Sequence, residues 1–103
     1  MVTVGSESAV IEIVTYRTTL ERAAFLATVP ATMDFLRTCA GFRGRQLAQA
    51  GDGQWAEVVQ WASMAEALDA AARFNATPLT AAFNAMIAPG TAAMRHYTVA
   101  VSG

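Results

Sequence analysis

Three residues that can exchange protons stand in segments that are rich in apolar residues. They are Glu12, Glu57 and His96, and they lie in the segments VIEIVTYR, QWAEVVQWA and MRHYTVAV. A buried ionisable group needs a partner or a purpose, because burying it alone is costly. We therefore identify Glu12, His96 and Glu57 as candidate catalytic residues. The structural alternatives are an ion pair for Glu12, a hydrogen-bonded core position for His96 and a wet strand edge for Glu57.

Four further residues are candidates for contact with a ligand. Tyr16, Trp55 and Trp61 each combine a broad apolar face with a polar tip, which suits stacking on a planar aromatic molecule. Arg45 is placed to neutralise a phenolate or a carboxylate. The alternatives are core filling for the aromatic residues and simple surface exposure for Arg45.

The composition excludes several classes of chemistry. All seven basic residues are arginines, so the chain has no lysine for a Schiff base or for a phosphate-binding loop. One cysteine and one histidine are too few for an ordinary zinc site or an internal disulfide, so we expect no metal. The basic residues are scattered and are offset by eight acidic ones, so we expect no nucleic-acid partner.

The length of 103 residues predicts a single domain that covers residues 1–103. Although 54% of the residues are hydrophobic, they occur in short runs, well below the roughly 20 consecutive apolar residues of a membrane span. The first residues lack the basic and apolar regions of a signal peptide. We therefore expect a cytoplasmic protein without a membrane partner.

The first half of the chain predicts a strand followed by a divided helix. Residues 10–17 are rich in β-branched side chains and favour a strand. Thr18 and Glu21 form a capping-box pattern, which predicts that a helix begins there. Pro30 lies inside this helix and should bend or divide it, because proline removes a backbone donor.

The second half predicts a hairpin, two helices and a last strand. Residues 44–50 and 54–62 flank the turn sequence GDG, and residues 94–101 form the last strand. The segment SMAE (63–66) is a second capping box, and Thr77 caps a third helix. The apolar stripes expected to face the core are Met64, Leu68, Ala71 and Phe74 in one helix, and Leu79, Phe83, Met86 and Ile87 in the other.

The order β-α-β-β-α-(α)-β is that of a ferredoxin-like α+β fold, whose antiparallel sheet carries its helices on one face. In that fold the last strand pairs with the first, so His96 can approach Glu12. The strands at 10–17 and 54–62 are apolar on both faces, and leaving one of these faces in water would be costly. We therefore expect two copies to pack sheet against sheet as a homodimer and to enclose the ligand chamber between them.

This order of elements resembles the antibiotic biosynthesis monooxygenase family of dimeric α+β barrels. The segments that carry the likeness are GFRGRQL, DGQWAEVVQWASMAEALDAA and MRHYTVAV, and the likeness spans nearly the whole chain. It implies a ferredoxin-like β-α-β-β-α-β fold and a homodimer. It leaves the reaction open, since that superfamily includes cofactor-free oxygenases, haem-degrading enzymes and lactone isomerases.

The sequence also departs from some members of that superfamily. Haem-degrading members carry an Asn on the first strand and a His on the second helix, whereas this chain has Glu12 and the histidine-free segment LDAAARFN. We therefore discount haem cleavage. Trp61, just before the second helix, stands where such proteins commonly have an aromatic residue at the pocket wall.

The resemblance and the candidate residues together predict a cofactor-independent monooxygenase acting on an aromatic or polyketide-like substrate. Such an enzyme needs a base, hydrogen bonds to the developing anion and a dry cavity, because an electron-rich carbanion itself must react with oxygen. Glu12 and His96 would handle the protons, and no cofactor is expected. Two alternatives remain open: a non-catalytic ligand-binding or dimerisation module of the same fold, and an isomerase or decarboxylase that uses the same pair.

Overall fold

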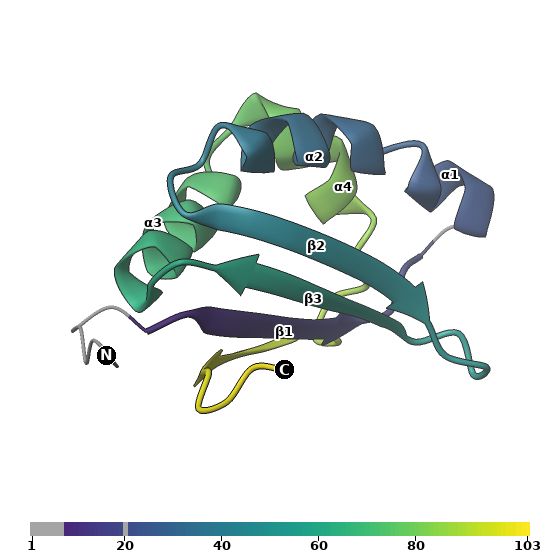
Figure 1. The fold of residues 1–103 in the computed structure, drawn as a ribbon. Coiled ribbons are helices and arrows are strands. Elements are labelled where there is room, and N and C mark those ends of the chain that lie inside the picture. The colour runs from purple at the N-terminus through teal and green to yellow at the C-terminus, as the bar shows by residue number, and fades with distance from the viewer. Residues whose placement is uncertain (1–7, 20) are drawn as a thin grey trace, which may run out of the picture.

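A four-stranded antiparallel sheet forms one layer of the molecule (Figure 1). The computed structural model describes residues 8–19 and 21–103. The strands are β1 (Val10–Tyr16), β2 (Phe42–Gln49), β3 (Trp55–Trp61) and β4 (Ala93–Thr98). Their order in the sheet is β2-β3-β1-β4, which confirms that β1 and β3 are central and that the last strand pairs with the first.

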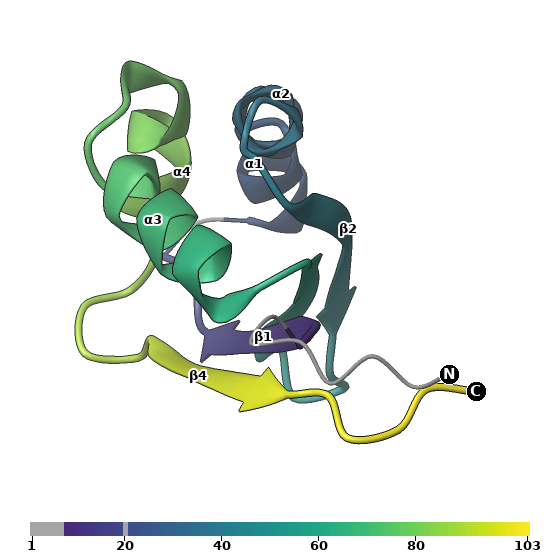
Figure 2. The same cartoon turned by 60° about the vertical axis from the view of Figure 1, so that its left-hand side comes forward.

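The helices form a second layer on one face of the sheet. They are α1 (Arg22–Leu26), α2 (Val29–Arg37), α3 (Met64–Phe74), the 3-10 helix η1 (Pro78–Thr80) and α4 (Ala81–Ala85). Figure 2 shows two rows above the sheet, α1 with α2 and α3 with α4. Among the described residues, the helices are all too short or too polar to cross a membrane.

The first helical segment is divided, as expected, but its start differs from the prediction. Pro30 lies in the first turn of α2, where its missing N–H costs no helical hydrogen bond. The predicted capping box is wrong, because Glu21 is itself the N-cap of α1 and makes no side-chain capping bond. Thr18 lies before this helix and forms an antiparallel β-bridge with Ile87.

The hairpin turn and the two later helix starts agree with the sequence analysis. Gly53 has a φ of +94°, a conformation that glycine adopts without strain and that lets the chain reverse between β2 and β3. The Ser63 hydroxyl accepts a hydrogen bond from the backbone N–H of Glu66 at 3.2 Å and so caps α3. Thr77 caps η1 by accepting from the backbone N–H of Leu79 at 3.4 Å.

Two leucines that were expected on buried helix stripes are exposed. Leu68 is 52% exposed and Leu79 is 48% exposed, so their assignment to the core is wrong. The residues that α3 buries are Ala67 and Ala70. Small side chains let a helix lie close to the sheet. The face of α3 that meets the sheet therefore carries these two alanines, and Leu68 lies on another face.

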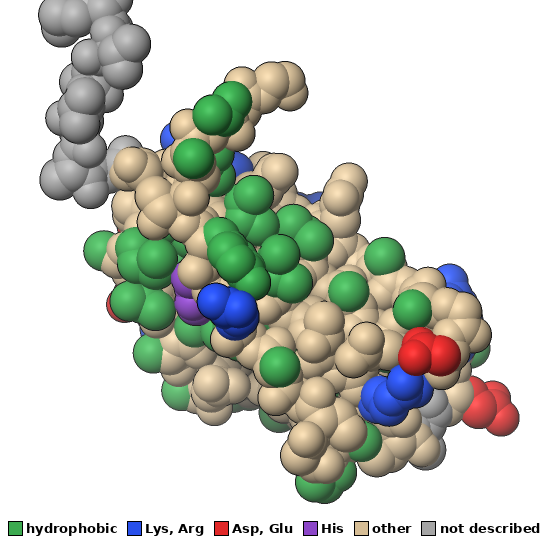
Figure 3. All heavy atoms as spheres, turned by 90° about the horizontal axis from the view of Figure 1, so that it is seen from below, with side chains coloured by type: hydrophobic (Ala, Val, Ile, Leu, Met, Phe, Trp, Pro, Cys, Tyr) green, Lys and Arg blue, Asp and Glu red, His purple; other side chains and the backbone are tan. Residues whose placement is uncertain are grey.

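The alternation of side chains along β1 and β3 decides which residues meet the helices. The buried residues of these strands all point toward the helical layer, and they are Val10, Glu12, Tyr16, Trp55, Glu57, Val59 and Trp61. The opposite face of the sheet is open. It carries Ile11, Ile13, Val58 and Tyr97, and Figure 3 shows hydrophobic side chains gathered there.

Two hydrophobic clusters lie between the sheet and the helices. The first cluster contains Val10, Phe35, Leu36, Cys39, Val59, Trp61, Ala67 and Ala70. The second cluster contains Tyr16, Phe25, Trp55 and Phe83. Phe74 of α3 packs against both clusters and therefore joins them.

Candidate active site

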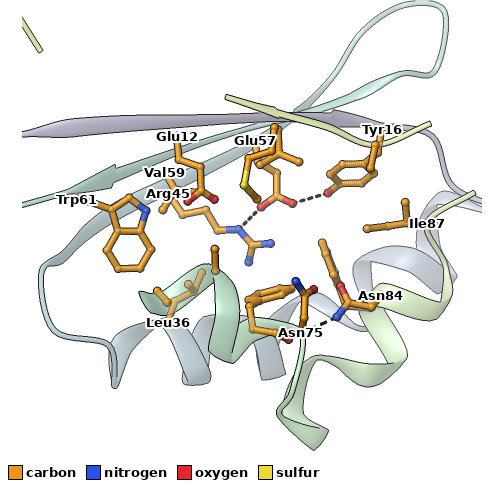
Figure 4. A pocket seen from close by; sticks show the side chains of 17 residues that line it. Glu12, Tyr16, Leu36, Arg45, Glu57, Val59, Trp61, Asn75, Asn84 and Ile87 are labelled. Atoms are coloured by element: carbon orange, nitrogen blue, oxygen red, sulfur yellow. Dashed lines mark hydrogen bonds and ion pairs between the residues drawn. The ribbon is translucent and has the colours of Figure 1, made fainter. Parts of the chain in front are cut away.

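A cavity of about 280 Å³ lies between the sheet and the helical layer (Figure 4). The sheet contributes Glu12, Val14, Tyr16, Arg45, Glu57, Val59, Trp61 and Met94 to its walls. The helices and adjoining loops contribute Leu36, Ala70, Ala71, Phe74, Asn75, Phe83, Asn84, Ile87 and Ala92. The strand residues among these walls lie on the sheet face that the helices cover, and not on the open face. The expectation that two copies must enclose the chamber is therefore wrong, because the helices already cover the sheet face that carries it.

A chain of buried hydrogen bonds runs from Tyr16 through the sheet to helix α2. The Tyr16 hydroxyl donates to Glu57 Oε2 at 2.6 Å, and Arg45 Nε donates to Glu57 Oε1 at 2.5 Å. Arg45 Nη1 donates to Thr32 Oγ1 at 2.7 Å. The side chains of Arg45 and Glu57 are only 3% and 8% exposed, so this ion pair is almost fully removed from water. The network thus connects three strands with α2.

The network determines which of its groups remain available to a ligand. Both carboxylate oxygens of Glu57 accept hydrogen bonds, so Glu57 is suited to holding Arg45 and Tyr16 in place. Burial, and next the charge of Glu57, raise the pKa of Tyr16 well above its ordinary value, so its hydroxyl stays protonated. Arg45 lies over the ring of Phe83 at 5.4 Å, and its Nη2 has no hydrogen-bond acceptor among the described residues.

Glu12 lies in the cavity wall opposite His96 of the neighbouring strand. The register of β1 and β4 pairs these two residues, and Glu12 Oε1 is 3.2 Å from His96 Nε2. Burial raises the pKa of the Glu12 carboxyl, while the nearby His96 and the indole of Trp61 act in the opposite direction and Glu57 adds to the rise. The balance lies above the ordinary value for a glutamate, which favours a role in proton exchange.

The indole N–H of Trp61 lies close enough to Glu12 to lower the pKa of that carboxyl, but no described residue accepts a hydrogen bond of normal geometry from it. Within the described part of the chain, Trp61 Nε1 is the one buried side-chain nitrogen or oxygen that makes no hydrogen bond. Figure 4 shows the indole in the cavity wall near Glu12. An unsatisfied buried donor typically costs about 1–3 kcal/mol, and an oxygen of a bound molecule would remove that cost.

The structure brings five of the seven predicted site residues to one cavity. Glu12, Tyr16, Arg45, Glu57 and Trp61 all line it. The other two do not. His96 reaches the cavity only through its contact with Glu12.

Trp55 is a core residue. Its ring centroid lies 4.8 Å from that of Phe25, and the guanidinium of Arg22 lies 5.4 Å from it on the helix side. The cavity walls do not include Trp55, so the prediction that it contacts a ligand has no support in the geometry.

The sequence analysis missed the polar residues that the helices add to the site. Asn84 of α4 lines the cavity and donates to the Phe74 carbonyl at 3.5 Å. Thr32 of α2 is fully buried and accepts from Arg45. Asn84 interrupts the apolar segment AAFNAMIA in the same way that Glu12 interrupts its strand, so the same signal could have identified it.

The cavity combines apolar walls with a small number of polar groups, a composition typical of sites for small organic ligands. Its volume is slightly below the range of about 300–1,000 Å³ that is common for such sites, which favours a small ligand. Within residues 8–19 and 21–103, no group of three or more His, Cys, Asp and Glu side chains is arranged to hold a metal ion.

Solved structures share the fold of this chain, although no protein-family model and no curated protein matches its sequence. SnoaB from Streptomyces nogalater, a cofactor-independent oxygenase, is similar with a TM-score of 0.77 and 18% identity over 92% of this chain and 96% of SnoaB. A proposed antibiotic biosynthesis monooxygenase from Bordetella bronchiseptica has a TM-score of 0.75 and 15% identity, covering 91% of this chain and 99% of that one. A proposed monooxygenase from Shewanella loihica PV-4 has a TM-score of 0.69 and 21% identity, covering 95% and 100%.

At these identities the similarity establishes the fold. The chain has the ferredoxin-like α+β fold of antibiotic biosynthesis monooxygenase-type proteins, which confirms the fold that the sequence predicted.

Proposed function

We propose that this chain binds a small aromatic molecule with an acidic C–H or O–H group and oxidises it with molecular oxygen, without a cofactor. The observation that carries the proposal is Glu12, a buried carboxyl in the cavity wall whose pKa is raised mainly by burial. Such a group accepts a proton from a weakly acidic substrate and returns it later in the reaction. The similarity of fold to SnoaB, which is a cofactor-independent oxygenase, supports this choice of reaction.

The proposed reaction balances without an external reductant. A methylene group flanked by aromatic rings loses a proton to Glu12, and the resulting carbanion gives one electron to O₂. The two radicals then combine through a new C–O bond to form a peroxide anion, which takes up a proton to become a hydroperoxide. Loss of water converts the carbon into a carbonyl. The methylene supplies all four electrons; one oxygen atom stays in the product, and the other leaves as water with two hydrogens.

Two donors in the cavity are suited to the negative charge that develops on a substrate oxygen. Trp61 Nε1 is buried and makes no hydrogen bond of normal geometry to a described residue, and Arg45 Nη2 has no acceptor among those residues either. Donors that are already fixed in a dry site stabilise a developing anion more than water does. The apolar remainder of the wall, which includes Val59 and Phe83, keeps water away from the carbanion.

Oxygen uptake tests the proposal. The protein is mixed with a panel of anthrones and hydroquinones, and O₂ consumption is recorded with an electrode. We expect uptake with at least one compound, and a loss of about 100-fold or more in Glu12→Gln, which removes the base. Glu21→Gln is the matched control, because Glu21 is exposed at the start of α1 and makes no side-chain capping bond.

The outcomes also separate the alternatives. Tight binding of these compounds without O₂ consumption would favour a non-catalytic ligand-binding module. Spectral changes of the substrate under anaerobic conditions would favour an isomerase or decarboxylase. Full turnover in Glu12→Gln would refute the assignment of Glu12.

We also propose that two copies associate through the open sheet face. Ile13 and Val58 of the central strands are partly buried there, and Tyr97 remains 41% exposed. Covering this face would remove apolar surface from water, and a second copy offers the same surface in a two-fold arrangement. Sedimentation velocity at low micromolar concentration should give a dimer. Ile13→Glu should give a monomer, while Leu68→Glu on the helical side should not; a monomeric wild type would contradict this proposal.

A further inference from the structure

We propose that His96 transfers protons between Glu12 in the cavity and the surrounding solvent. His96 is thus a positioning residue that acts through Glu12 and does not touch the substrate. This inference rests on the proposed function, because it concerns the path taken by the proton that Glu12 accepts.

The position of His96 in the sheet supports this role. Its Nε2 atom lies 3.2 Å from Glu12 Oε1, and the two residues are direct partners in the register of β1 and β4. Glu12 lines the cavity, whereas His96 does not, so the imidazole contacts the carboxyl from outside the cavity. β4 is an edge strand, and the His96 side chain is 15% exposed, compared with 9% for Glu12 (Figure 3, purple).

The other polar groups near Glu12 are poorly suited to carry a proton. Trp61 can donate a hydrogen bond through its indole N–H, but this group does not ionise at moderate pH. Glu57 acts on Glu12 through its charge, and both of its oxygens are already engaged by Tyr16 and Arg45. Among the described residues, His96 is therefore the one titratable group with a hydrogen bond to Glu12.

The chemistry of imidazole fits the path. When Glu12 has accepted a proton from the substrate, it donates that proton to Nε2 of His96, and Nδ1 releases its own proton to water. In the reverse direction Nδ1 accepts a proton from solvent while Nε2 returns one to Glu12, which then protonates the peroxide anion. The number of protons on the pair is unchanged after each full turnover. His96 Nδ1 makes no hydrogen bond to another described residue, which leaves it available to water.

A nuclear magnetic resonance titration tests the coupling without any substrate. The chain has one histidine, so its imidazole ¹⁵N signals need no assignment by mutation. We expect the His96 signals to change when Glu12 becomes protonated, and Glu12→Gln should remove this change. The same titration curve in the wild type and in Glu12→Gln would overturn the proposal.

Turnover measurements test the relay itself. At low buffer concentration His96→Gln should lower kcat by about 10–100-fold with little change in KM, and it should flatten the pH profile. Added imidazole should restore at least about a tenth of wild-type kcat in His96→Gln but not in Glu12→Gln. Arg95→Gln is the matched control, because Arg95 lies on the same strand and points to the opposite face.

The two kinds of failure are distinguishable. Wild-type kcat in His96→Gln, or a loss that imidazole does not restore, would overturn the relay while leaving the oxygenase proposal intact. If the wild type oxidises none of the compounds, the proposed function fails, and the imidazole titration still decides whether His96 and Glu12 are coupled.

Discussion

Replacing Arg45 by Met tests whether the buried network holds the site together. The substitution removes the partner of Glu57 and of Thr32 and keeps most of the apolar stem of the side chain. Breaking a buried ion pair by removing one partner typically costs about 3–5 kcal/mol, because the remaining charge stays out of water. Tyr16 still donates to Glu57 at 2.6 Å, so we expect the lower end of that range, about 3 kcal/mol.

Urea unfolding followed by circular dichroism measures this loss. Arg37→Met is the matched control, since Arg37 pairs with Asp34 at the surface, where the two side chains are 65% and 72% exposed. A pair of that kind contributes about 0–1 kcal/mol. In thermal unfolding, Arg45→Met should lower Tm by roughly 4–8 °C for each kcal/mol lost.

A double-mutant cycle with Glu57→Gln isolates the interaction between the two side chains. Each single variant leaves one buried charge without its partner, whereas the double variant has no charge at either position. The double variant should therefore lose less stability than the sum of the single losses, by about 0.5–3 kcal/mol. The reasoning is refuted by an Arg45→Met loss no larger than that of Arg37→Met, or by a coupling energy of zero.

Glu12→Gln should change the pH dependence of stability. Because the pKa of Glu12 is raised in the folded protein, protonated Glu12 contributes to the free energy of folding. This stabilising contribution is complete below about pH 4.5 and is lost as the pH rises through the raised pKa. As the pH rises above about 4.5, the unfolding free energy of the wild type should therefore fall relative to that of Glu12→Gln. A difference between the two proteins that does not change with pH would contradict this. Ser63→Ala should lower the unfolding free energy measured in urea by about 1 kcal/mol, because it removes the cap of α3. An unchanged unfolding free energy would show that this cap does not stabilise the protein. Gly41→Ala should lower Tm far more than Gly51→Ala. Gly41 has a φ of +80°, and a Cβ there would overlap the Glu66 side chain, whereas a Cβ at Gly51 would have no other atom within 4 Å. Equal melting temperatures of the two variants would contradict this reasoning.

The strands of this protein were predictable because their segments are rich in β-branched and aromatic residues and are bounded by turn and helix-start signals. Successive side chains along a strand alternate between its two faces. That alternation placed Glu12 on the same face as Tyr16, and the expected strand order brought His96 beside Glu12. A pattern of this kind determines both the face and the neighbour of each residue once the order of the strands is known.

The helical side of the cavity was less accessible to sequence reasoning. Helix α3 turns the face with the small residues Ala67 and Ala70 toward the sheet, whereas a pattern based on large apolar residues predicts that Leu68 is buried. Thr32 was unmarked in the sequence, since its role depends on Arg45, which lies 13 positions away and on another element. Long-range contacts of this kind depend on how helices dock, and local spacing does not encode them.

The position of the cavity between two hydrophobic clusters bears on how its shape can change over evolutionary time. Each cluster keeps its own aromatic residues, Trp61 in one and Phe25 in the other, so neither depends on the side chains that border only the cavity. Exchanging a small wall residue such as Ala71 for a larger one would reshape the space without removing an anchor from either cluster. The shape and volume of the cavity can therefore change while the same scaffold persists.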